Sequence, residues 1–535
     1  MNIINKKTTI LFIVLFSIIT FIRLFNLSSS PASLYWEEAA LGYDAYSILK
    51  TNKDFHGHKF PLVAFESFGD YKPSGYFYAT ALSEKFLGLN TLAVRLPSII
   101  SGFIIIIFSY LISLEIFKNN KQKIIIGLIS AALVGVSPWA FQFSRAGFEA
   151  NLATALSAMA IWLLLKSQKS IKHLFSSVVL FAISIYTYHS SRIFTPLFLL
   201  IYLLINFKSI LKNKRSWLLA GLIGLILTFP IIINLNNPEV KHRFEETSAF
   251  SDLAPIIKIN QQRADHQNSF VSKIIYHRYW YYTETVIKNI ASNLNLNYLL
   301  ISGDENKRHS TGESGIFYPL DFILIISGLI YLFKHKSKPL LILIFWWLAA
   351  LVPASLTKTN PHALRSLLAI PAPQILASFG AFTLFSTLKK YKKITLYTFI
   401  FIYSTLVFRH YYNYFTSYTK TYASQWQYGY QDLIRYIKDN QDNYDQVFIT
   451  NQLGRPSIYY FYHLKINPKA VQQEESTAKK DQGERLSFKN INFYLPPLIP
   501  SNSLSVTTTP YSSDRDILYI VKDLINQPVF YIYEH

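Results

Sequence analysis

The sequence contains no cysteine among its 535 residues, so disulfides, thiolate nucleophiles and Cys-ligated metal sites are excluded. Charged residues are scarce, at 16%, and acidic residues are fewer than basic ones, 31 against 52. The motifs of many soluble enzymes are also missing: the sequence has no P-loop, no GxGxxG before a helix, no HExxH and no GxSxG. These absences leave no support for the nucleotide-binding, zinc-peptidase or α/β-hydrolase chemistry that such motifs indicate.

Apolar residues, by contrast, make up 51% of the chain and aromatic residues 16%, which is typical of a polytopic membrane protein. The net charge of +21 would suggest a nucleic-acid partner if it were concentrated on a soluble domain. Most lysines instead fall in short runs between apolar segments, so we expect no nucleic-acid partner. The first apolar run, ILFIVLFSIITFIRLFNL, lacks a clean small-x-small cleavage site and is predicted to be an uncleaved anchor.

A membrane-spanning helix needs about 20 apolar residues. We expect eleven transmembrane helices within a domain that covers residues 1–410, at 8–26, 92–117, 123–140, 150–166, 172–187, 193–207, 216–234, 317–333, 338–354, 364–388 and 394–410. Residues 73–88 are short and contain Glu84 and Lys85, so we predict a helix that lies at the membrane interface.

The distribution of lysine predicts the topology. Alternate connections are basic, namely KNNKQK, KSQKSIK, KSILKNKR, KHKSK and KKYKK. The positive-inside rule therefore places the N-terminus in the cytoplasm. Two large outer loops follow, 27–91 and 235–316, and residues 411–535 then lie outside the cytoplasmic membrane.

The C-terminal part, 411–535, has the composition of a small α/β domain. YQDLIRYIKDN resembles a helix, and four runs are β-like: DQVFIT, SIYYFYHL, DILYIV and VFYIYEH. The polar stretch 468–487 is predicted to be a mobile loop.

Positive charge is normally rare at the outer ends of spans, yet four arginines fall there: Arg95, Arg145, Arg192 and Arg365. The guanidinium fork suits phosphate oxygens, so these residues indicate an anionic ligand. Three polar pairs have helical spacing and share a face if the turn between them is helical, namely Arg145 with Glu149, His189 with Arg192, and His362 with Arg365.

Structural explanations compete with this one. Arg95 can extend to lipid headgroups, and Arg145 can form an ion pair with Glu149. The acids Glu37 and Glu38 can be a solvated helix start. His189, His309 and His362 can ligate a metal only if the fold brings them together.

Seven segments in order resemble a known family: YWEEAALGYDAYSILKTNKDFHG, FGDYKPSGYFY, VRLPSIISG, SPWAFQFSRAGFEANLA, YTYHSSRIF, RHSTGESGIFYPLD and NPHALRSLLAIP. Together they are similar to bacterial members of the protein O-mannosyltransferase and lipid A aminoarabinose transferase superfamily, which has the GT-C fold. The resemblance covers about residues 8–410. It implies an enzyme that takes a sugar from a polyprenyl-phosphate donor and gives it to a protein, glycan or lipid acceptor outside the cytoplasmic membrane.

The resemblance also implies roles for particular residues. The family's first loop holds an Asp-Glu pair whose first acid is the catalytic base, and Glu37 stands at that position. Glutamate is one methylene longer than aspartate, so the base must be repositioned, and Glu38 is the alternative. Lys72 matches a lysine that contacts the donor phosphate, and Glu149 resembles a second outer acid.

The remaining basic residues are placed at the phosphate by charge: Arg145, Arg192 and Arg365, with His189 and His362 beside them. A carboxylate that accepts the acceptor's proton, without a covalent nucleophile, predicts inversion at the anomeric carbon. We expect no cofactor and no metal requirement, because the basic residues can neutralise the phosphate, and a divalent ion is the alternative. A lipid-linked glycan ligase or polymerase is the second hypothesis, and a transporter is the third.

Overall fold

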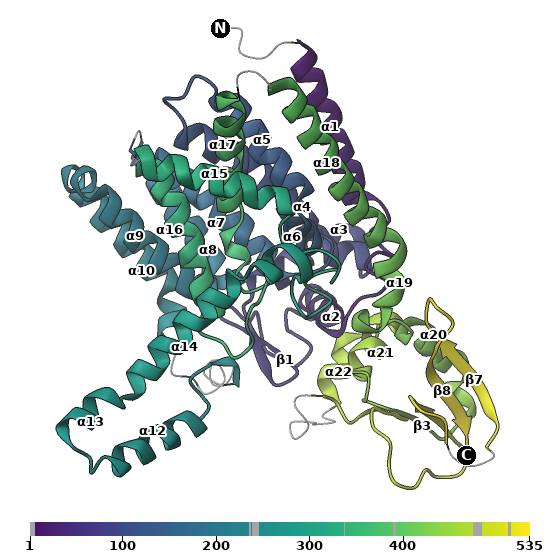
Figure 1. Cartoon of the computed structure of the whole chain (residues 1–535). Coiled ribbons are helices and arrows are strands. Elements are labelled where there is room, and N and C mark those ends of the chain that lie inside the picture. The colour runs from purple at the N-terminus through teal and green to yellow at the C-terminus, as the bar shows by residue number, and fades with distance from the viewer. Residues whose placement is uncertain are drawn as a thin grey trace. The chain divides into compact units, whose positions relative to one another are not determined.

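The structure is a computed structural model that describes residues 6–168, 170–234, 237, 246–335, 338–388, 392–474, 484–511 and 515–535. These residues are mostly helical, with one six-stranded sheet near the C-terminus (Figure 1). Their contacts define two compact units. The first unit comprises residues 1–20, 101–143 and 150–407, and the second comprises 21–100, 144–149 and 408–535.

The first unit contains all or most of the residues of each apolar helix, and some helix ends, such as residues 91–100 and 408–413, belong to the second unit. The apolar helices are α1 (Lys6–Leu24), α4 (Thr91–Ile116), α5 (Lys123–Val136), α6 (Pro138–Ser144), α7 (Glu149–Lys166), α8 (Ile171–Thr187), α9 (Ser191–Lys212), α10 (Lys214–Ile233), α15 (Pro319–His335), α16 (Lys338–Ser355), η2 (Leu367–Ala369), α17 (Ala372–Thr387) and α18 (Lys392–Asn413). Within this unit α15 packs along α17, and α16 packs against α9. The contact between α15 and α17 is very close at Gly380, where an added Cβ would lie 1.8 Å from the carbonyl oxygen of Leu324.

A described helix overlaps each of the eleven expected spans, although 123–140 is divided between α5 and α6, and 364–388 is α-helical only from Ala372. Among the described residues three helices, α4, α9 and α10, are long and apolar enough to cross a membrane by themselves. The pair α5 and α6, bent by 58°, adds a fourth if it is one broken span. The chain is therefore a multi-pass membrane protein, and the number eleven stays a prediction.

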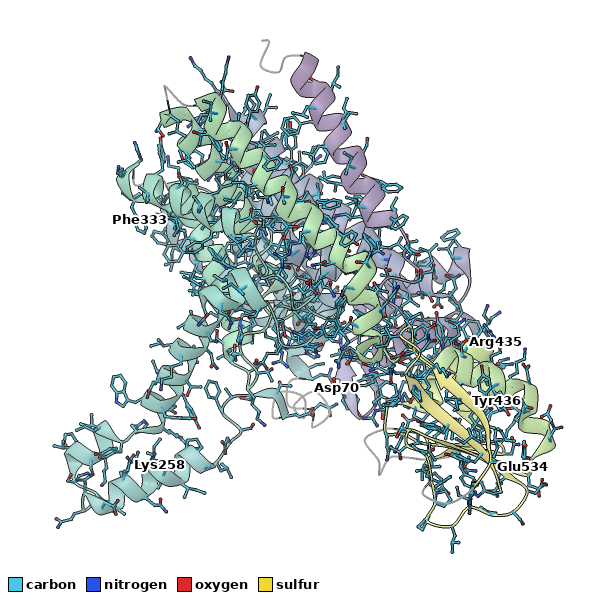
Figure 2. All side chains as sticks on the ribbon, turned by 45° about the vertical axis from the view of Figure 1, so that its right-hand side comes forward. Asp70, Lys258, Phe333, Arg435, Tyr436 and Glu534 are labelled. Atoms are coloured by element: carbon cyan, nitrogen blue, oxygen red, sulfur yellow. The ribbon has the colours of Figure 1, made fainter. Side chains whose placement is uncertain are left out.

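The expected outer loop 235–316 contains helices of its own: α12 (Ala254–Asp265), α13 (Phe270–Ile275), α14 (Arg278–Asn293) and the π-helical turn η1 (Asn297–Ser302). In Figure 2, Lys258 marks α12 and Phe333 marks α15. Residues 235–236 and 238–245 of this loop lie outside the described part of the chain.

The second unit is organised around α2 (Trp36–Thr51). Two acids in its first turn complement the helix dipole, and Asn52 ends the helix in the left-handed conformation. A hairpin follows, formed by β1 (Phe65–Ser67) and β2 (Asp70–Lys72), and then α3 (Gly75–Leu87). The helix expected at 73–88 is thus present. Gly42 lets α2 approach its neighbours, because a Cβ there would lie 2.7 Å from Tyr462 and 2.8 Å from Val94.

The C-terminal domain is α/β, as predicted. Its helices are η3 (Tyr414–Tyr418), α19 (Thr419–Thr421), η4 (Ala423–Trp426), α20 (Tyr430–Asn440), η5 (Gln441–Asn443), α21 (Pro456–Leu464) and α22 (Pro468–Gln473). The strands are β3 (Gln446–Ile449), β4 (Ser487–Phe488), β5 (Ile491–Asn492), β6 (Ser503–Thr507), β7 (Ile517–Lys522) and β8 (Pro528–Glu534), in the order β4-β5-β3-β6-β8-β7. The central β3 pairs in parallel with β5 and β6, and the outer pairings are antiparallel. Figure 2 labels Arg435 and Tyr436 on α20 and Glu534 on β8.

One secondary-structure prediction in this domain was wrong. SIYYFYHL is not a strand but α21, which begins with Pro456 at its first position, where a missing N–H costs nothing. Residues 456–462 are all buried, so this segment has no polar face from which a helical period could be recognised. Of the loop expected at 468–487, residues 468–473 form α22 and residues 475–483 lie outside the described chain.

Candidate active site

Glu37 and Lys72 form an ion pair in the polar cluster of the second unit. Glu37 is in the first turn of α2, and Lys72 ends β2 immediately before Pro73. Lys72 Nζ lies 3.2 Å from Glu37 Oε1. The Glu37 side chain is 35% exposed, whereas that of Lys72 is only 4% exposed. A carboxylate that solvent can reach is thus paired with an ammonium group held inside the protein.

Glu38, the neighbouring acid, is fully buried and engaged on both oxygens. Arg95 Nε donates to its Oε1 at 3.0 Å and Arg95 Nη2 to its Oε2 at 3.2 Å. The backbone N–H of Gly147 donates to Oε1 at 2.7 Å. A bidentate, charge-assisted pair of this kind is strong and directional.

Arg95 also binds the chain that leads into α2. Its Nη1 donates to the carbonyl oxygens of Leu27 and Pro31, and its Nη2 donates to that of Ser33. The side chain of Arg95 is 0% exposed, so it does not extend to lipid headgroups. The structure therefore excludes the explanation that Arg95 extends to lipid headgroups.

Arg145 has a similar arrangement. Its Nη1 donates to the carbonyl of Arg23, and its Nη2 donates to those of Asn26 and Ser30. The guanidinium lies over the rings of Tyr414 and Phe415, at 5.8 and 5.4 Å from their centres. Both terminal nitrogens are thus engaged with backbone carbonyl groups.

Glu149 begins α7 and is 7% exposed. It interacts electrostatically with Lys72 and Glu37, so the structure brings all three groups together. Helical spacing does not relate it to Arg145, because residues 145–148 are not helical and interrupt α6 and α7. The other two pairs also lie outside regular α-helix, since His189 precedes α9 and residues 362–365 form turns.

Two further acids of the first loop are buried. Asp44 accepts a hydrogen bond from the Phe55 N–H, and Asp54 pairs with His58 at 3.0 Å. Burial raises the pKa of Asp44 well above its usual value, and the charge of Asp54 adds to this effect. Burial likewise raises the pKa of Asp54, although His58 opposes the shift. These buried, hydrogen-bonded acids fit a structural role better than that of an exposed base.

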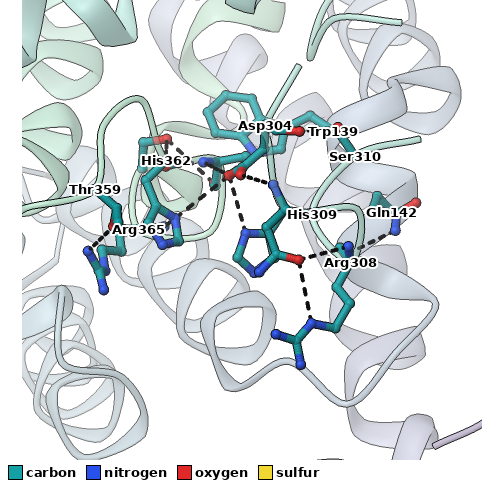
Figure 3. A network of polar contacts seen from close by, with 12 residues as sticks. Trp139, Gln142, Asp304, Arg308, His309, Ser310, Thr359, His362 and Arg365 are labelled. Atoms are coloured by element: carbon teal, nitrogen blue, oxygen red, sulfur yellow. Dashed lines mark hydrogen bonds and ion pairs between the residues drawn. The ribbon is translucent and has the colours of Figure 1, made fainter. Parts of the chain in front are cut away.

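A second polar cluster lies in the first unit, where Asp304 contacts two histidines (Figure 3). Asp304 Oδ2 lies 3.2 Å from His309 Nδ1 and 3.8 Å from His362 Nδ1. His309 and His362, which the sequence raised as metal ligands if the fold gathers them, are therefore adjacent. His189 is not part of this group among the described residues. The sequence analysis did not single out Asp304. This residue lies just before the segment RHSTGESGIFYPLD, five residues before His309, and nothing in the local sequence indicates its contact with His362.

The pKa values in this cluster are shifted in opposite directions. Burial would raise the pKa of Asp304, but the hydrogen bond and charge of His309, the charge of His362 and the Ala363 N–H lower it to about 2. Burial, with the charges of His309 and Arg365, holds the pKa of His362 well below its usual value. An ionised carboxylate therefore faces a neutral imidazole at neutral pH.

Arg365 and Arg192 differ in how they are held. Arg365 Nη1 donates to Thr359 Oγ1 at 3.0 Å. The Nε and Nη2 groups of Arg192 are buried and have no hydrogen-bond partner among the described residues. Arg192 therefore has donors available for a ligand oxygen.

Glu84, on α3, is a further buried acid of the second unit. It is 4% exposed, and neither of its carboxyl oxygens has a hydrogen-bond partner among the described residues. Burial raises the pKa of Glu84 to about 9. The group is therefore protonated in the folded protein at neutral pH.

Comparison with known proteins confirms the resemblance. Residues 71–233 match the family model described as dolichyl-phosphate-mannose-protein mannosyltransferase. None of the curated proteins matches the chain.

The fold is that of solved GT-C glycosyltransferases. ArnT from Cupriavidus metallidurans in the apo state is 12% identical, with a TM-score of 0.58 over 98% of this chain and 97% of that one. The same protein bound to undecaprenyl phosphate gives 0.57 at 12% identity, over 99% and 98%. The oligosaccharyltransferase of Archaeoglobus fulgidus in the apo form gives 0.50 at 12% identity, over 88% of this chain and 65% of that one.

Glu84 generates a prediction about pH. The pKa of Glu84 is about 9 in the folded state against 4.5 for the ordinary group, so the unfolded state loses its proton first and stability falls as pH rises through this window. Glu84→Gln cannot ionise and should be more stable than the native protein at pH 8, by up to a few kcal/mol, but not at pH 4.5. Thermal unfolding of the detergent-solubilised protein at both pH values measures this. The exposed Glu305→Gln is the control, and an unchanged difference between native and Glu84→Gln at the two pH values would contradict the assignment.

Proposed function

We propose that this membrane glycosyltransferase, whose residues 71–233 belong to the dolichyl-phosphate-mannose-protein mannosyltransferase family, moves a sugar from a polyprenyl-phosphate donor to an acceptor hydroxyl. The reaction takes place at the outer face of the cytoplasmic membrane. The observation that carries the proposal is the pair of Glu37 and Lys72, in which an accessible carboxylate lies 3.2 Å from a buried ammonium.

Glu37 is the better candidate for the general base because part of its side chain is accessible to an acceptor. Its side chain is 35% exposed, while Glu38 is fully buried and bound by Arg95 and Gly147. A base must come within hydrogen-bond distance of the proton that it removes. We assign proton transfer to Glu37 and the positioning of the first turn of α2 to Glu38.

Lys72 supplies the charge that the leaving group needs. When the acceptor oxygen forms its bond to the anomeric carbon, the bond from that carbon to the phosphate oxygen breaks and the electron pair remains on the phosphate. The acceptor proton passes to Glu37, so the phosphate leaves as an anion and needs no acid. A positive group fixed near that oxygen stabilises the developing charge. Lys72 pairs with Glu37 and interacts electrostatically with Glu149, and the donor phosphate would compete with these acids for the ammonium.

The other basic residues take different parts in this proposal. Arg192 has donors without a partner among the described residues, so within the first unit it is the arginine we favour for binding an anionic group, with His189, Arg365 and His362 as further candidates. We assign Arg145 to holding residues 23–30, because its terminal nitrogens are bonded to carbonyl groups there. That ArnT of the same fold has been solved with undecaprenyl phosphate supports a polyprenyl donor. The acceptor is a protein, glycan or lipid.

The basic connections between spans support an N-terminus in the cytoplasm and a C-terminal domain outside. Within the second unit this domain packs against α2. Tyr459 donates to the Leu34 carbonyl, Tyr43 donates to that of Ile466, and the Gln472 amide donates to Ser47, Thr51 and Asp54. We therefore propose that the C-terminal domain fixes the helix that carries Glu37.

Substitution of the pair tests the proposal. Glu37→Gln should lower turnover about 10²- to 10⁴-fold and Lys72→Met by a similar factor, while Glu37→Asp, which restores the family's residue, retains more activity than Glu37→Gln. The assay is release of polyprenyl phosphate from labelled polyprenyl-phosphate sugars in proteoliposomes supplied with envelope extract as acceptor. The exposed Lys53→Met is the matched lysine control. Full activity in a folded Glu37→Gln protein would exclude Glu37 as the base.

Gly454 tests the role of the C-terminal domain. Its φ is +127°, and an added Cβ would lie 2.8 Å from Trp36 Cε3, at the start of α2. Gly454→Ala should therefore displace Trp36 and lower turnover by about 10-fold or more, because small displacements of a catalytic group are costly. Gly88→Ala is the control, since Gly88 has a φ of +72° and no atom within 4 Å of the added Cβ. Equal turnover of the two variants in the same assay would show that the domain does not position α2.

A further inference from the structure

The short helix α13 is exposed on its apolar side and buried on its polar side. Its large apolar residues follow the spacing i, i+1, i+4 and i+5, which places them on one face, and all are exposed: Phe270, Val271, Ile274 and Ile275. We call these four residues the α13 face. The buried residue of α13 is Ser272, which is 2% exposed, whereas Phe270 is 79% exposed. A helix that packs on a protein core buries its apolar face, so this arrangement is the reverse of the usual one.

Exposed apolar side chains continue on both sides of α13. Leu253 and Ile257, four residues apart, are exposed at the start of α12, and Tyr279 and Trp280 are exposed in the first turn of α14. Tyrosine and tryptophan combine an apolar ring with a polar O–H or N–H group and are enriched where hydrocarbon meets water. The exposed residues of this segment are therefore typical of a membrane interface.

Hydrogen bonds hold α12 and α13 in a defined arrangement, so the exposure of the α13 face is a property of the fold. Gln267 and Asn268 form the turn between the two helices, with φ values of +55° and +48°. Arg263 Nε on α12 donates to the Tyr276 carbonyl at 2.9 Å. The Tyr276 hydroxyl and His266 Nε2 are hydrogen-bonded at 3.1 Å, and their rings are stacked.

Both ends of this segment are tied to apolar helices. The helix α10, which is long and apolar enough to cross a membrane, ends at Ile233, and α12 begins at Ala254. At the other end α14 packs against α16, where Asn289 Nδ2 donates to the Ser355 carbonyl at 2.9 Å. Figure 1 shows α12 and α13 at the end of α14 that is far from α16. An apolar surface attached to the spans in this way can reach lipid without a separate partner.

The charge of the segment favours anionic lipid. Residues 253–280 contain four basic side chains and one acid, namely Lys258, Arg263, Lys273 and Arg278 against Asp265. Of the basic residues, Lys258, Lys273 and Arg278 are exposed. Basic groups beside an apolar surface strengthen membrane binding when the headgroups are anionic, because the headgroups attract them while the apolar side chains leave water.

We propose that α12, α13 and the first turn of α14 form a membrane-surface anchor. The α13 face inserts into the interface of the bilayer that the protein spans, and the basic residues around it bind the phosphate groups of anionic lipids. The anchor holds the middle of the loop 235–316 against the membrane by burying apolar side chains that the described residues leave exposed. This inference does not depend on the transfer reaction, because contact with lipid is measured without donor or acceptor. The competing explanation is that a second copy of the chain or another protein covers the α13 face.

Spin labelling of the full chain tests the anchor, and the lack of cysteine in the sequence makes each label unique. The single variants Phe270→Cys and Ile274→Cys each carry a nitroxide, in lipid nanodiscs of phosphatidylcholine and phosphatidylglycerol. EPR measures how often the nitroxide collides with oxygen, which concentrates in the bilayer, and with a water-soluble nickel chelate. We expect an oxygen-to-nickel collision ratio several-fold higher at both positions than at Leu498→Cys, which labels an 88% exposed residue of the C-terminal domain.

Two results of this experiment would overturn the proposal. A ratio at Phe270→Cys and Ile274→Cys equal to that at Leu498→Cys would place the α13 face in water. Low collision rates with both reagents would show that protein covers the face.

The part assigned to anionic headgroups has its own test. In the Phe270→Cys background, the double variant Lys273→Gln/Arg278→Gln should lower the oxygen-to-nickel ratio in the same nanodiscs. Lys438→Gln/Lys522→Gln, which removes two exposed lysines of the C-terminal domain, is the matched control and should leave the ratio unchanged. Equal ratios in the two double variants would exclude electrostatic binding of anionic lipid by this segment.

Discussion

The ion pair between Glu38 and Arg95 is the interaction on which the first-loop site depends. It is completely buried, and its two members also bind the Gly147 N–H and three carbonyl groups of residues 27–33. It therefore joins the segment before α2, the start of α4 and the break between α6 and α7. Removal of one partner from such a pair typically costs about 3–5 kcal/mol, because the other charge is left buried. The position of Glu37 next to Lys72 follows from this attachment.

Two adjacent acids thus have different tasks because their surroundings differ. Glu38 is enclosed by donors that hold it in one geometry, whereas Glu37 pairs with the buried Lys72 ammonium and reaches solvent. In the proposed reaction, Glu37 accepts a proton while Glu38 keeps the first turn of α2 in place. The C-terminal domain adds to the same rigidity, since its tyrosines and Gln472 bind both ends of α2.

Sequence alone identified the features that repeat or carry an unusual charge. The apolar runs predicted the positions of the helices. The acids that follow the first apolar run, together with Lys72, predicted a polar cluster, and Glu37 and Lys72 are in contact in the structure. Features that depend on tertiary contacts were not predictable. Arg145 binds carbonyl groups, which no spacing rule indicates, and α21 is buried on every side, so its pattern suggested a strand. Asp304 meets His362 only because two loops 58 residues apart fold together.

The stereochemistry of the transferred sugar tests the central claim most directly, which is that Glu37 activates an acceptor for direct displacement of the phosphate. NMR of the product and of the polyprenyl-phosphate donor would establish the anomeric configuration of each. The account predicts inversion, because one displacement by the deprotonated acceptor reverses the configuration. Retention, whether by a covalent glycosyl-enzyme intermediate or by attack from the side of the leaving phosphate, would contradict the direct displacement assigned to Glu37.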